Sequence, residues 1–268
     1  MEHQTLLQRR RLAGAWIVGP VFCLLLLSAP YGVQAEGGSQ KEQPKSPVLE
    51  RYRKAWEAHK GELDLALIAQ LAADLGSKDT SARRVAFARL KAETGLDRVN
   101  WHYVFDPDGD PAEQKRTLRD WEEYAKTLDV AVTKWVPSLM EKPDNDSLRA
   151  AWTFRIGLGA PHRAFLPLLR EIVANPDEAL RIRYRALRGI ALIPHDGLIE
   201  YLLAQMDDQD LYWAAWNLID RLTRRRVPRV QPRKNEPAEW QRAKAAFLKW
   251  WAANKKDFKH NRFKVMGM

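Results

Sequence analysis

Cysteine is almost absent from this chain, with one residue, Cys23, among 268. Cys23 lies in an apolar N-terminal stretch that we expect to be removed, and the residues before it, Pro20-Val21-Phe22, lack the small side chain of a lipoprotein site. The chain beyond this stretch has no thiol, which excludes disulfides, thiolate metal sites and a cysteine nucleophile. A chain of this length can be stabilised by an apolar core alone.

Clustered metal-binding or catalytic residues are also missing. No two histidines beyond the N-terminal stretch lie within five residues of each other, so there is no HExxH motif or helical His pair; they are His59, His102, His162, His195 and His260. Neither a G-x-S-x-G motif nor a phosphate-binding loop occurs, and Gly157-Leu158-Gly159 is more typical of a helix end. We therefore predict no catalytic residue, no metal, no cofactor and no enzymatic activity.

One acidic segment, Asp106-Pro107-Asp108-Gly109-Asp110, resembles a calcium-binding loop only superficially. Such a loop needs glycine at its sixth position and a bidentate acid at its twelfth, whereas here glycine is fourth and Thr117 is twelfth. The composition predicts a tight turn instead.

Only one long apolar run occurs, from Leu12 to Pro30, and three arginines, Arg9 to Arg11, precede it. Val33-Gln34-Ala35 follows with small residues at the positions that signal peptidases require. Residues 1–35 are therefore predicted to be a signal peptide cleaved after Ala35, which places the mature protein in the periplasm or outside the cell. An uncleaved membrane anchor is the alternative, although Gly14, Gly19 and Pro20 interrupt the run.

An apolar pattern recurs along the rest of the chain. Four stretches place apolar residues at i, i+1, i+4 and i+8 and an aspartate at i+12, with Thr133 as the one exception, and the first four positions form one stripe on a helix. The last three stretches begin 33 residues apart, which is typical of stacked helix pairs. The sets are Leu67, Ile68, Leu71, Leu75 and Asp79; Val132, Thr133, Val136, Met140 and Asp144; Phe165, Leu166, Leu169, Val173 and Asp177; and Leu198, Ile199, Leu202, Met206 and Asp210.

Each of these aspartates can accept hydrogen bonds from the first turn of a second helix, so Asp79, Asp144, Asp177 and Asp210 are predicted N-caps. The period fails between residues 95 and 130, where we expect an aromatic loop and a helix through Trp121. The predicted organisation is a flexible spacer at 36–47, a helical repeat domain at 48–258 that contains the irregular insertion at about 95–130, and a basic tail at 259–268.

Arginines stand early in the second helix of three repeats, at Arg83, Arg149 and Arg181, and Ala214 takes that place in the fourth. Together with Thr94-Gly95, Asp106-Pro107 and Trp121, this pattern resembles exported bacterial HEAT-repeat proteins over most of residues 63–257. The resemblance implies an all-α fold, a short α-solenoid of stacked antiparallel helix pairs with atypical capping helices at both ends. It also implies a non-enzymatic protein-binding scaffold or adaptor, because most such relatives act that way.

Positive charge gathers at the C-terminal end, where residues 221–268 hold 15 Lys/Arg against 3 Asp/Glu. Aromatic residues are interleaved, and Trp and Arg are favoured anchors at protein interfaces. Two structural alternatives stay open, in which the tryptophans belong to the core and the arginines are simply solvated. The candidate partner-binding residues are Trp213, Arg224, Arg225, Arg226, Arg229, Arg233, Lys234, Trp240 and Trp250.

The partner is predicted to be a protein whose identity the sequence does not reveal. The alternative is an anionic polymer or a membrane surface bound by the same basic end, with salt-sensitive affinity. Nucleic acid is the less favoured polymer because the chain is predicted to act outside the cytosol.

Overall fold

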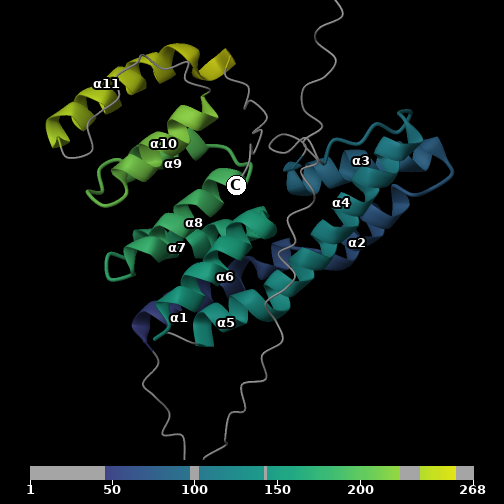
Figure 1. Cartoon of the computed structure of the whole chain (residues 1–268), viewed down its shortest axis with the longest axis horizontal. Coiled ribbons are helices and arrows are strands. Elements are labelled where there is room, and N and C mark those ends of the chain that lie inside the picture. The colour runs from purple at the N-terminus through teal and green to yellow at the C-terminus, as the bar shows by residue number, and fades with distance from the viewer. Residues whose placement is uncertain (1–45, 97–102, 142–143, 224–235, 258–268) are drawn as a thin grey trace, which may run out of the picture. The chain divides into compact units, whose positions relative to one another are not determined.

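The computed structural model describes residues 46–96, 103–141, 144–223 and 236–257, all within one unit of the chain, Pro44–Met268. These residues form helices and no strand, which confirms the all-α class for the described part (Figure 1). The α-helices are α1 (Pro47–His59), α2 (Leu65–Asp74), α3 (Thr80–Thr94), α4 (Pro111–Val130), α5 (Val136–Glu141), α6 (Asp146–Gly159), α7 (Leu166–Ala174), α8 (Leu180–Leu192), α9 (Leu198–Gln205), α10 (Tyr212–Leu222) and α11 (Pro237–Asn254).

Helices are present at both segments of the first predicted pair, as α2 and α3, and a short turn joins them. Asp79 caps α3, since its carboxylate accepts a hydrogen bond from the Ser81 backbone N–H at 2.8 Å. Asp64 caps α2 in the same manner through Leu67 N–H at 2.8 Å. At the other end of α3, Gly95 has a φ of 66°, a left-handed conformation that favours glycine.

The predicted caps at Asp144, Asp177 and Asp210 are wrong. Asn145 caps α6, accepting from Leu148 N–H at 3.0 Å, one residue later than predicted. Neither α8 nor α10 has a side-chain cap on the residue before it. Other side chains accept the backbone hydrogen bonds in the turns before these helices. Asp208, for example, accepts from the backbone N–H of Asp210 at 2.9 Å. The apolar stripe therefore predicts where a helix lies, but it does not predict how many residues the following turn contains or which of them caps the next helix.

Between residues 111 and 141 the helical backbone is continuous. The helix α4 passes through a π-helical turn, Ala131–Trp135 (η4), directly into α5. The predicted irregular insertion and the first helix of the next repeat therefore share one stretch of helix. The loop before α4 carries Tyr103, whose ring centroid lies 4.9 Å from that of Trp121 and 5.6 Å from that of Tyr124.

The predicted apolar stripes form the core. All four apolar positions of the third and fourth sets are buried, with Phe165, Leu169 and Leu202 fully inaccessible to solvent. Only Leu67 and Val132 are partly exposed, and Thr133, the residue that breaks the apolar pattern, is exposed. Burial of these side chains is the main driving force for packing the helices together.

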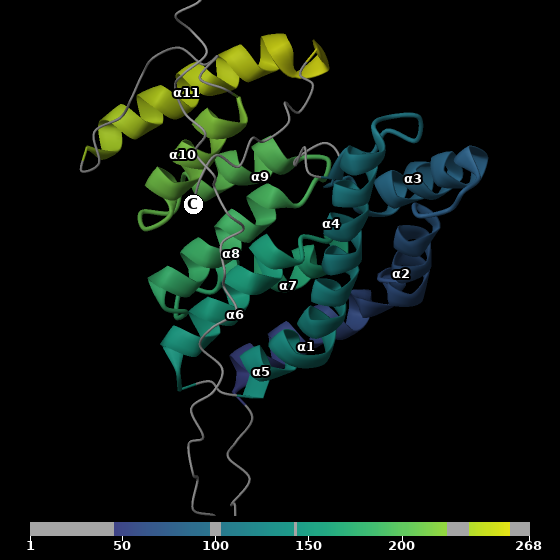
Figure 2. The same ribbon diagram turned by 45° about the vertical axis from the view of Figure 1, so that its right-hand side comes forward.

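Helix α2 packs on α3 and α4, α8 packs on α6 and α7, and α9 packs on α10 (Figure 2). Helix α1 crosses to α7, far along the chain, with the Trp56 and Phe165 rings stacked at 5.3 Å. The closest helix contact joins α6 and α8, where a Cβ atom on Gly157 would lie 2.3 Å from the Gly189 Cα. Gly157 therefore serves this contact rather than the end of α6, which falls at Gly159.

The last described helix, α11, begins at Pro237 as predicted, and its side chains contact α9 and α10. Trp251 donates a hydrogen bond to Glu200 of α9 at 3.1 Å, and the Phe247 ring meets Trp216 of α10 edge-on. In the part of the chain that the structure describes, no helix has the length and apolar character needed to cross a membrane.

Candidate partner-binding surface

Four buried polar side chains connect α1, α6 and the turn between α7 and α8. Arg149 of α6 donates two hydrogen bonds to the Glu178 carboxylate, at 2.7 and 2.5 Å. The Tyr52 hydroxyl of α1 donates to the same carboxylate at 2.9 Å and accepts from the Asn175 amide at 3.1 Å. Burial raises the pKa of Tyr52 above its ordinary value, so the hydroxyl stays protonated and donates. This network holds α1 on the helices it packs against.

Arg183 is the fourth residue of α8, as Arg149 is of α6, and it is likewise buried. Its Nε donates to the Val173 carbonyl at 2.9 Å, and its guanidinium forms an ion pair with Asp208 in the turn before α10. Arg83 of α3 likewise donates to the Pro107 carbonyl, at 2.7 Å, in the turn before α4. The family resemblance pointed to Arg181 as the repeat arginine of α8, but Arg183 faces inward and Arg181 faces outward.

Three other arginines lie on the outer side of α6 and α8, and we call Arg155, Arg181 and Arg185 the arginine face. The Arg185 guanidinium lies 4.5 Å from the Phe154 ring centroid, and that of Arg155 lies 5.8 Å from the Trp135 centroid. Arg181 donates to the Ser147 hydroxyl at 3.0 Å. Among the described residues, no Asp or Glu forms an ion pair with any of these three arginines.

Beside the arginine face an open cleft separates the first turns of α8 and α10, and we call it the helix cleft. Its volume is about 750 Å³. Leu180 and Tyr184 on its α8 wall are 50% and 39% exposed, which is high for such apolar side chains. The residues that line it are Ala179, Leu180, Arg181, Tyr184, Gln209, Asp210, Tyr212, Trp213 and Ala214.

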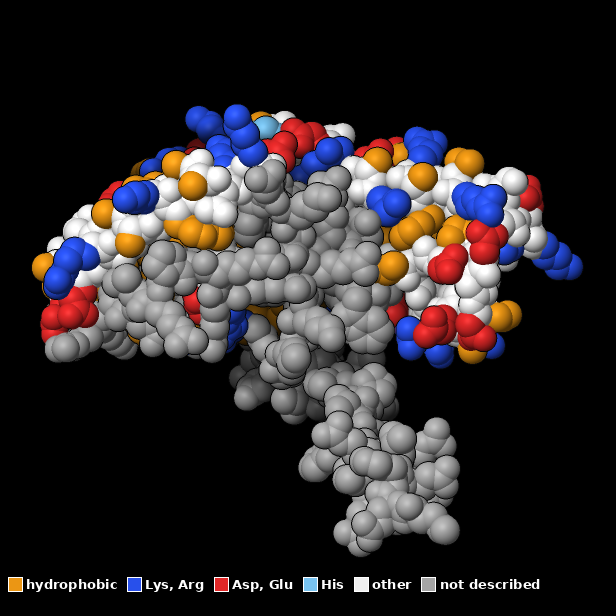
Figure 3. Space-filling view, turned by 90° about the horizontal axis from the view of Figure 1, so that it is seen from above, with side chains coloured by type: hydrophobic (Ala, Val, Ile, Leu, Met, Phe, Trp, Pro, Cys, Tyr) orange, Lys and Arg blue, Asp and Glu red, His pale blue; other side chains and the backbone are white. Residues whose placement is uncertain are grey.

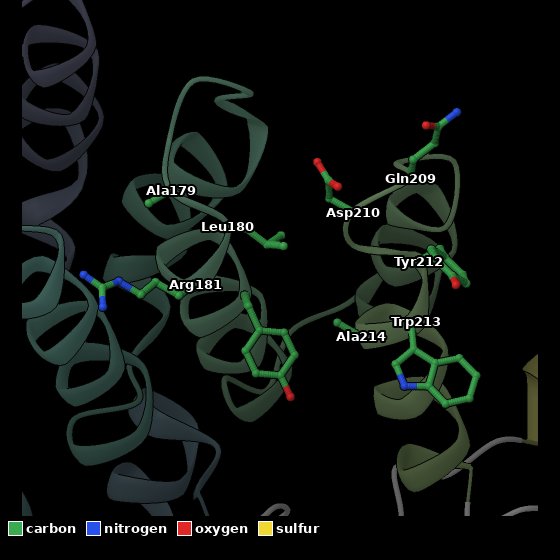
Figure 4. Close-up of a pocket in the computed structure, with 9 residues that line it drawn as sticks. Ala179, Leu180, Arg181, Gln209, Asp210, Tyr212, Trp213 and Ala214 are labelled. Atoms are coloured by element: carbon green, nitrogen blue, oxygen red, sulfur yellow. The ribbon is translucent and has the colours of Figure 1, made fainter. Parts of the chain in front are cut away.

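Figure 4 shows how the two walls of the helix cleft differ. Leu180 and Asp210 face each other across the opening, while Arg181 points away from it toward the neighbouring helix, where it meets Ser147. Ala214 lies on the α10 wall, four residues after Asp210, just as Arg181 stands four residues after Asp177. The small methyl group leaves open a space that a longer side chain would fill.

The predicted tryptophans lie in three different settings. Trp213 is partly buried and lines the helix cleft. Trp240 is only 7% exposed, and its ring packs on Tyr212. Trp250 is partly buried, with its ring centroid 5.4 Å from that of Phe247. Of the three, Trp213 is the one that the structure brings to the cleft.

The predicted basic residues lie outside the described residues, so their prediction stays open; they are Arg224, Arg225, Arg226, Arg229, Arg233 and Lys234. On the face seen in Figure 3, described side chains of both charge signs are interspersed with hydrophobic ones. Charge therefore does not single out a site on that face.

The acidic segment before α4 forms a turn, as predicted. Gly109 N–H donates to the Asp106 carbonyl at 3.1 Å, Asp110 caps α4, and Asp108 forms an ion pair with Arg84 at 2.6 Å. Within the described ranges, no group of three or more His, Cys, Asp or Glu side chains is placed to hold a metal ion.

Comparison of the chain with protein-family models, with curated proteins and with solved structures finds no match. Any assignment of function must therefore come from the surface itself.

The sequence prediction did not include the arginine face or the Leu180–Tyr184 wall. The signal was present, because α8 carries four arginines and no acidic residue, and three of them, Arg181, Arg185 and Arg188, are spaced along one side of a helix.

Proposed function

We propose that this protein is a non-enzymatic binding module that holds a segment of a partner protein in the helix cleft between α8 and α10. The observation that carries the proposal is the open 750 Å³ cleft with an exposed apolar wall. Exposed apolar patches beside polar rims are typical of interaction sites. Arginine, tyrosine and tryptophan, the residue types enriched at interface anchors, all contribute to this surface.

The proposal includes the HEAT-like arrangement, in which successive antiparallel helix pairs stack into a short solenoid. The inward arginines support it, because Arg83, Arg149 and Arg183 each bind the turn that leads into a later helix. Stacked pairs of this kind present their second helices, here α6, α8 and α10, as one extended surface. Such a surface suits a partner longer than a small molecule.

We also propose that the module acts in the periplasm or outside the cell after removal of residues 1–35. The charged, apolar and small-residue pattern of the N-terminus supports this location. Intact-mass analysis of the protein from its native cells tests it, with a chain that begins at Glu36 as the expected result. A chain of full mass in a membrane fraction would favour the anchored alternative.

Site-specific photo-cross-linking in the native cells tests the binding site. A photoreactive residue at Leu180 is expected to capture a partner protein. The same residue at Leu248, a leucine of α11 that is 45% exposed against 50% for Leu180, is the matched control and should capture none. Equal products at both positions, or none at Leu180, would contradict a partner in the helix cleft.

The alternative, binding of an anionic polymer or membrane surface through the basic C-terminal end, is supported by the charge excess of residues 221–268. It predicts retention on anionic vesicles that falls steeply with added salt and that is lost on charge reversal at Arg224, Arg225 and Arg226.

A further inference from the structure

We propose that the partner segment is an acidic peptide that lays its carboxylates on the arginine face and places one apolar side chain in the helix cleft. This proposal rests on the proposed binding function and adds the chemistry of the partner. Four observations support it: the composition of α8, the support under each outer arginine, the order of apolar and basic residues, and the position of Asp210.

Helix α8 carries four arginines and no acidic side chain. Arg183 is the one that turns inward, where it is 5% exposed and paired with Asp208. Arg181 and Arg185 lie four residues apart and therefore share the outer side of the helix. Arg181 and Arg185 have no acidic residue on α8 to balance them, so these outward guanidiniums can attract an anionic segment.

Aromatic or hydroxyl groups of other elements hold the outer arginines in place. Arg185 lies over Phe154, Arg155 lies near Trp135, and Arg181 is hydrogen-bonded to Ser147. A guanidinium that rests on a ring by its face keeps the N–H groups of its edge free to donate, and these match the two oxygens of a carboxylate. Because the ring already restricts the side chain, less entropy is lost when a carboxylate binds.

Apolar and basic positions follow each other directly along α8. Leu180 precedes Arg181 and Tyr184 precedes Arg185, so the apolar wall of the helix cleft adjoins the arginine face. A matching ligand needs a hydrophobic side chain close to acidic ones. A peptide can supply both, whereas a uniform chain of phosphates or sulfates supplies only the charge.

Asp210 stands on the opposite rim of the cleft and faces Leu180 (Figure 4). Its side chain is 66% exposed and lies 3.9 Å from the nearest Arg183 nitrogen, so it has room to accept further hydrogen bonds. This carboxylate repels a polyanion at the entrance but can accept an N–H group from a peptide backbone. The geometry therefore favours an acidic peptide over a polyanion or an anionic lipid surface.

Selection from a phage-displayed library of random peptides on the immobilised full chain tests the proposal. The enriched peptides are expected to carry Asp or Glu beside an aromatic residue or leucine. Enrichment of basic or neutral peptides would overturn the acidic partner and leave the proposed binding function standing, provided that the peptides still cross-link at Leu180. Enrichment of no peptide would overturn the proposal.

The best selected peptide is then measured by fluorescence anisotropy. The double variant Arg181→Glu/Arg185→Glu is expected to lower affinity about tenfold, because each reversal replaces an attraction with a repulsion. The matched control, Arg89→Glu/Arg119→Glu, makes the same charge change at exposed positions of α3 and α4 and should leave affinity unchanged. Equal losses in both variants would mean that net charge alone draws the peptide, which overturns the assigned surface.

A second pair of variants tests the apolar anchor. Leu180→Ala is expected to weaken binding several-fold by removing part of the cleft wall, while Leu248→Ala should have no effect. Anionic vesicles serve as the competing ligand. If they bind the chain as strongly as the peptide does, and lose that binding on Arg181→Glu/Arg185→Glu, the surface recognises lipid and the proposal fails.

Discussion

The inner and outer sides of helices α6 and α8 use the same residue type in opposite ways. Arg149 and Arg183, on the inner side, are 6% and 5% exposed and paired with carboxylates. Arg155 and Arg185, on the outer side, lie near aromatic rings and have no acidic partner among the described residues. Buried charge must be matched within the fold, whereas exposed charge is stabilised by water and stays open to a ligand. Inner arginines therefore hold helices together, and outer arginines are free to bind.

The largest effect is expected where the inner pairing is broken. Glu178→Gln removes the charge that Arg149 requires and weakens a hydrogen bond from Tyr52. An unmatched buried guanidinium should cost about 3–5 kcal/mol in the free energy of unfolding. Urea denaturation measures the loss. Asp108→Asn, which breaks the exposed pair with Arg84, is the control and should change stability little. Similar losses in both variants would mean that burial does not separate the two kinds of pair.

A buried titratable group should also make the stability of the fold depend on pH. Burial lowers the pKa of His162 to about 4 from an ordinary 6.5, and the side chain is 1% exposed. The unfolded chain takes up this proton near pH 6.5 and the folded chain only near pH 4, so stability should fall as pH drops through that window. The expected loss is on the order of 3 kcal/mol.

Thermal and urea unfolding between pH 7 and pH 4 measure this dependence. Since carboxylates also titrate in that range, the informative comparison is with His162→Asn. Asparagine cannot take up the proton but can still accept from the Ala164 backbone N–H, as His162 does at 3.2 Å. A slope identical in both proteins would show that His162 contributes nothing to the acid sensitivity.

Close packing on the inner side should also be sensitive to a single methyl group. Gly157→Ala places a Cβ atom 2.3 Å from the Gly189 backbone and forces α6 and α8 apart, at an expected cost of about 1–3 kcal/mol. Gly159→Ala, in the same helix, meets its nearest neighbour at 3.7 Å and should be tolerated. Melting temperatures of the two variants give the comparison, and equal values would mean that the helices yield at the crossing.

The smallest effect on stability is expected on the outer side. Arg185→Ala should change the free energy of unfolding by no more than about 0.5 kcal/mol, since it removes only a partly exposed contact with Phe154. Peptide binding should nevertheless weaken. A large loss of stability in urea denaturation would instead make Arg185 part of the structural framework and remove the distinction between the two sides.

Much of the helical pattern could be predicted from sequence. The stripes around Phe165 and Leu198 are buried as predicted, because apolar side chains at helical spacing have no other way to leave water. The start of α11 at Pro237 and the cap at Asp79 were predicted by local chemistry that involves only adjacent residues. The predicted caps at Asp177 and Asp210 are wrong because other groups accept the hydrogen bonds in these turns. Which nearby group accepts depends on how the next helix packs.

The candidate site could likewise be predicted only in part from the sequence. Trp213, Trp240 and Trp250 are indistinguishable as sequence, yet one lines the cleft, one is buried and one is partly covered. Whether a large aromatic residue becomes core or surface depends on which helices come to lie over it. The sequence could nominate all three but could not separate them.

The amino-acid sequence by itself determined that the described part of this protein is helical, where most of its helices run and which stripes they bury, because helical periodicity is a local property. Only the tertiary structure decided which arginine of α8 turns inward, that Gly157 meets Gly189, and that Leu180 faces Asp210 across an open cleft. Those relations join residues of different helices, and a contact between helices exists only once they have packed.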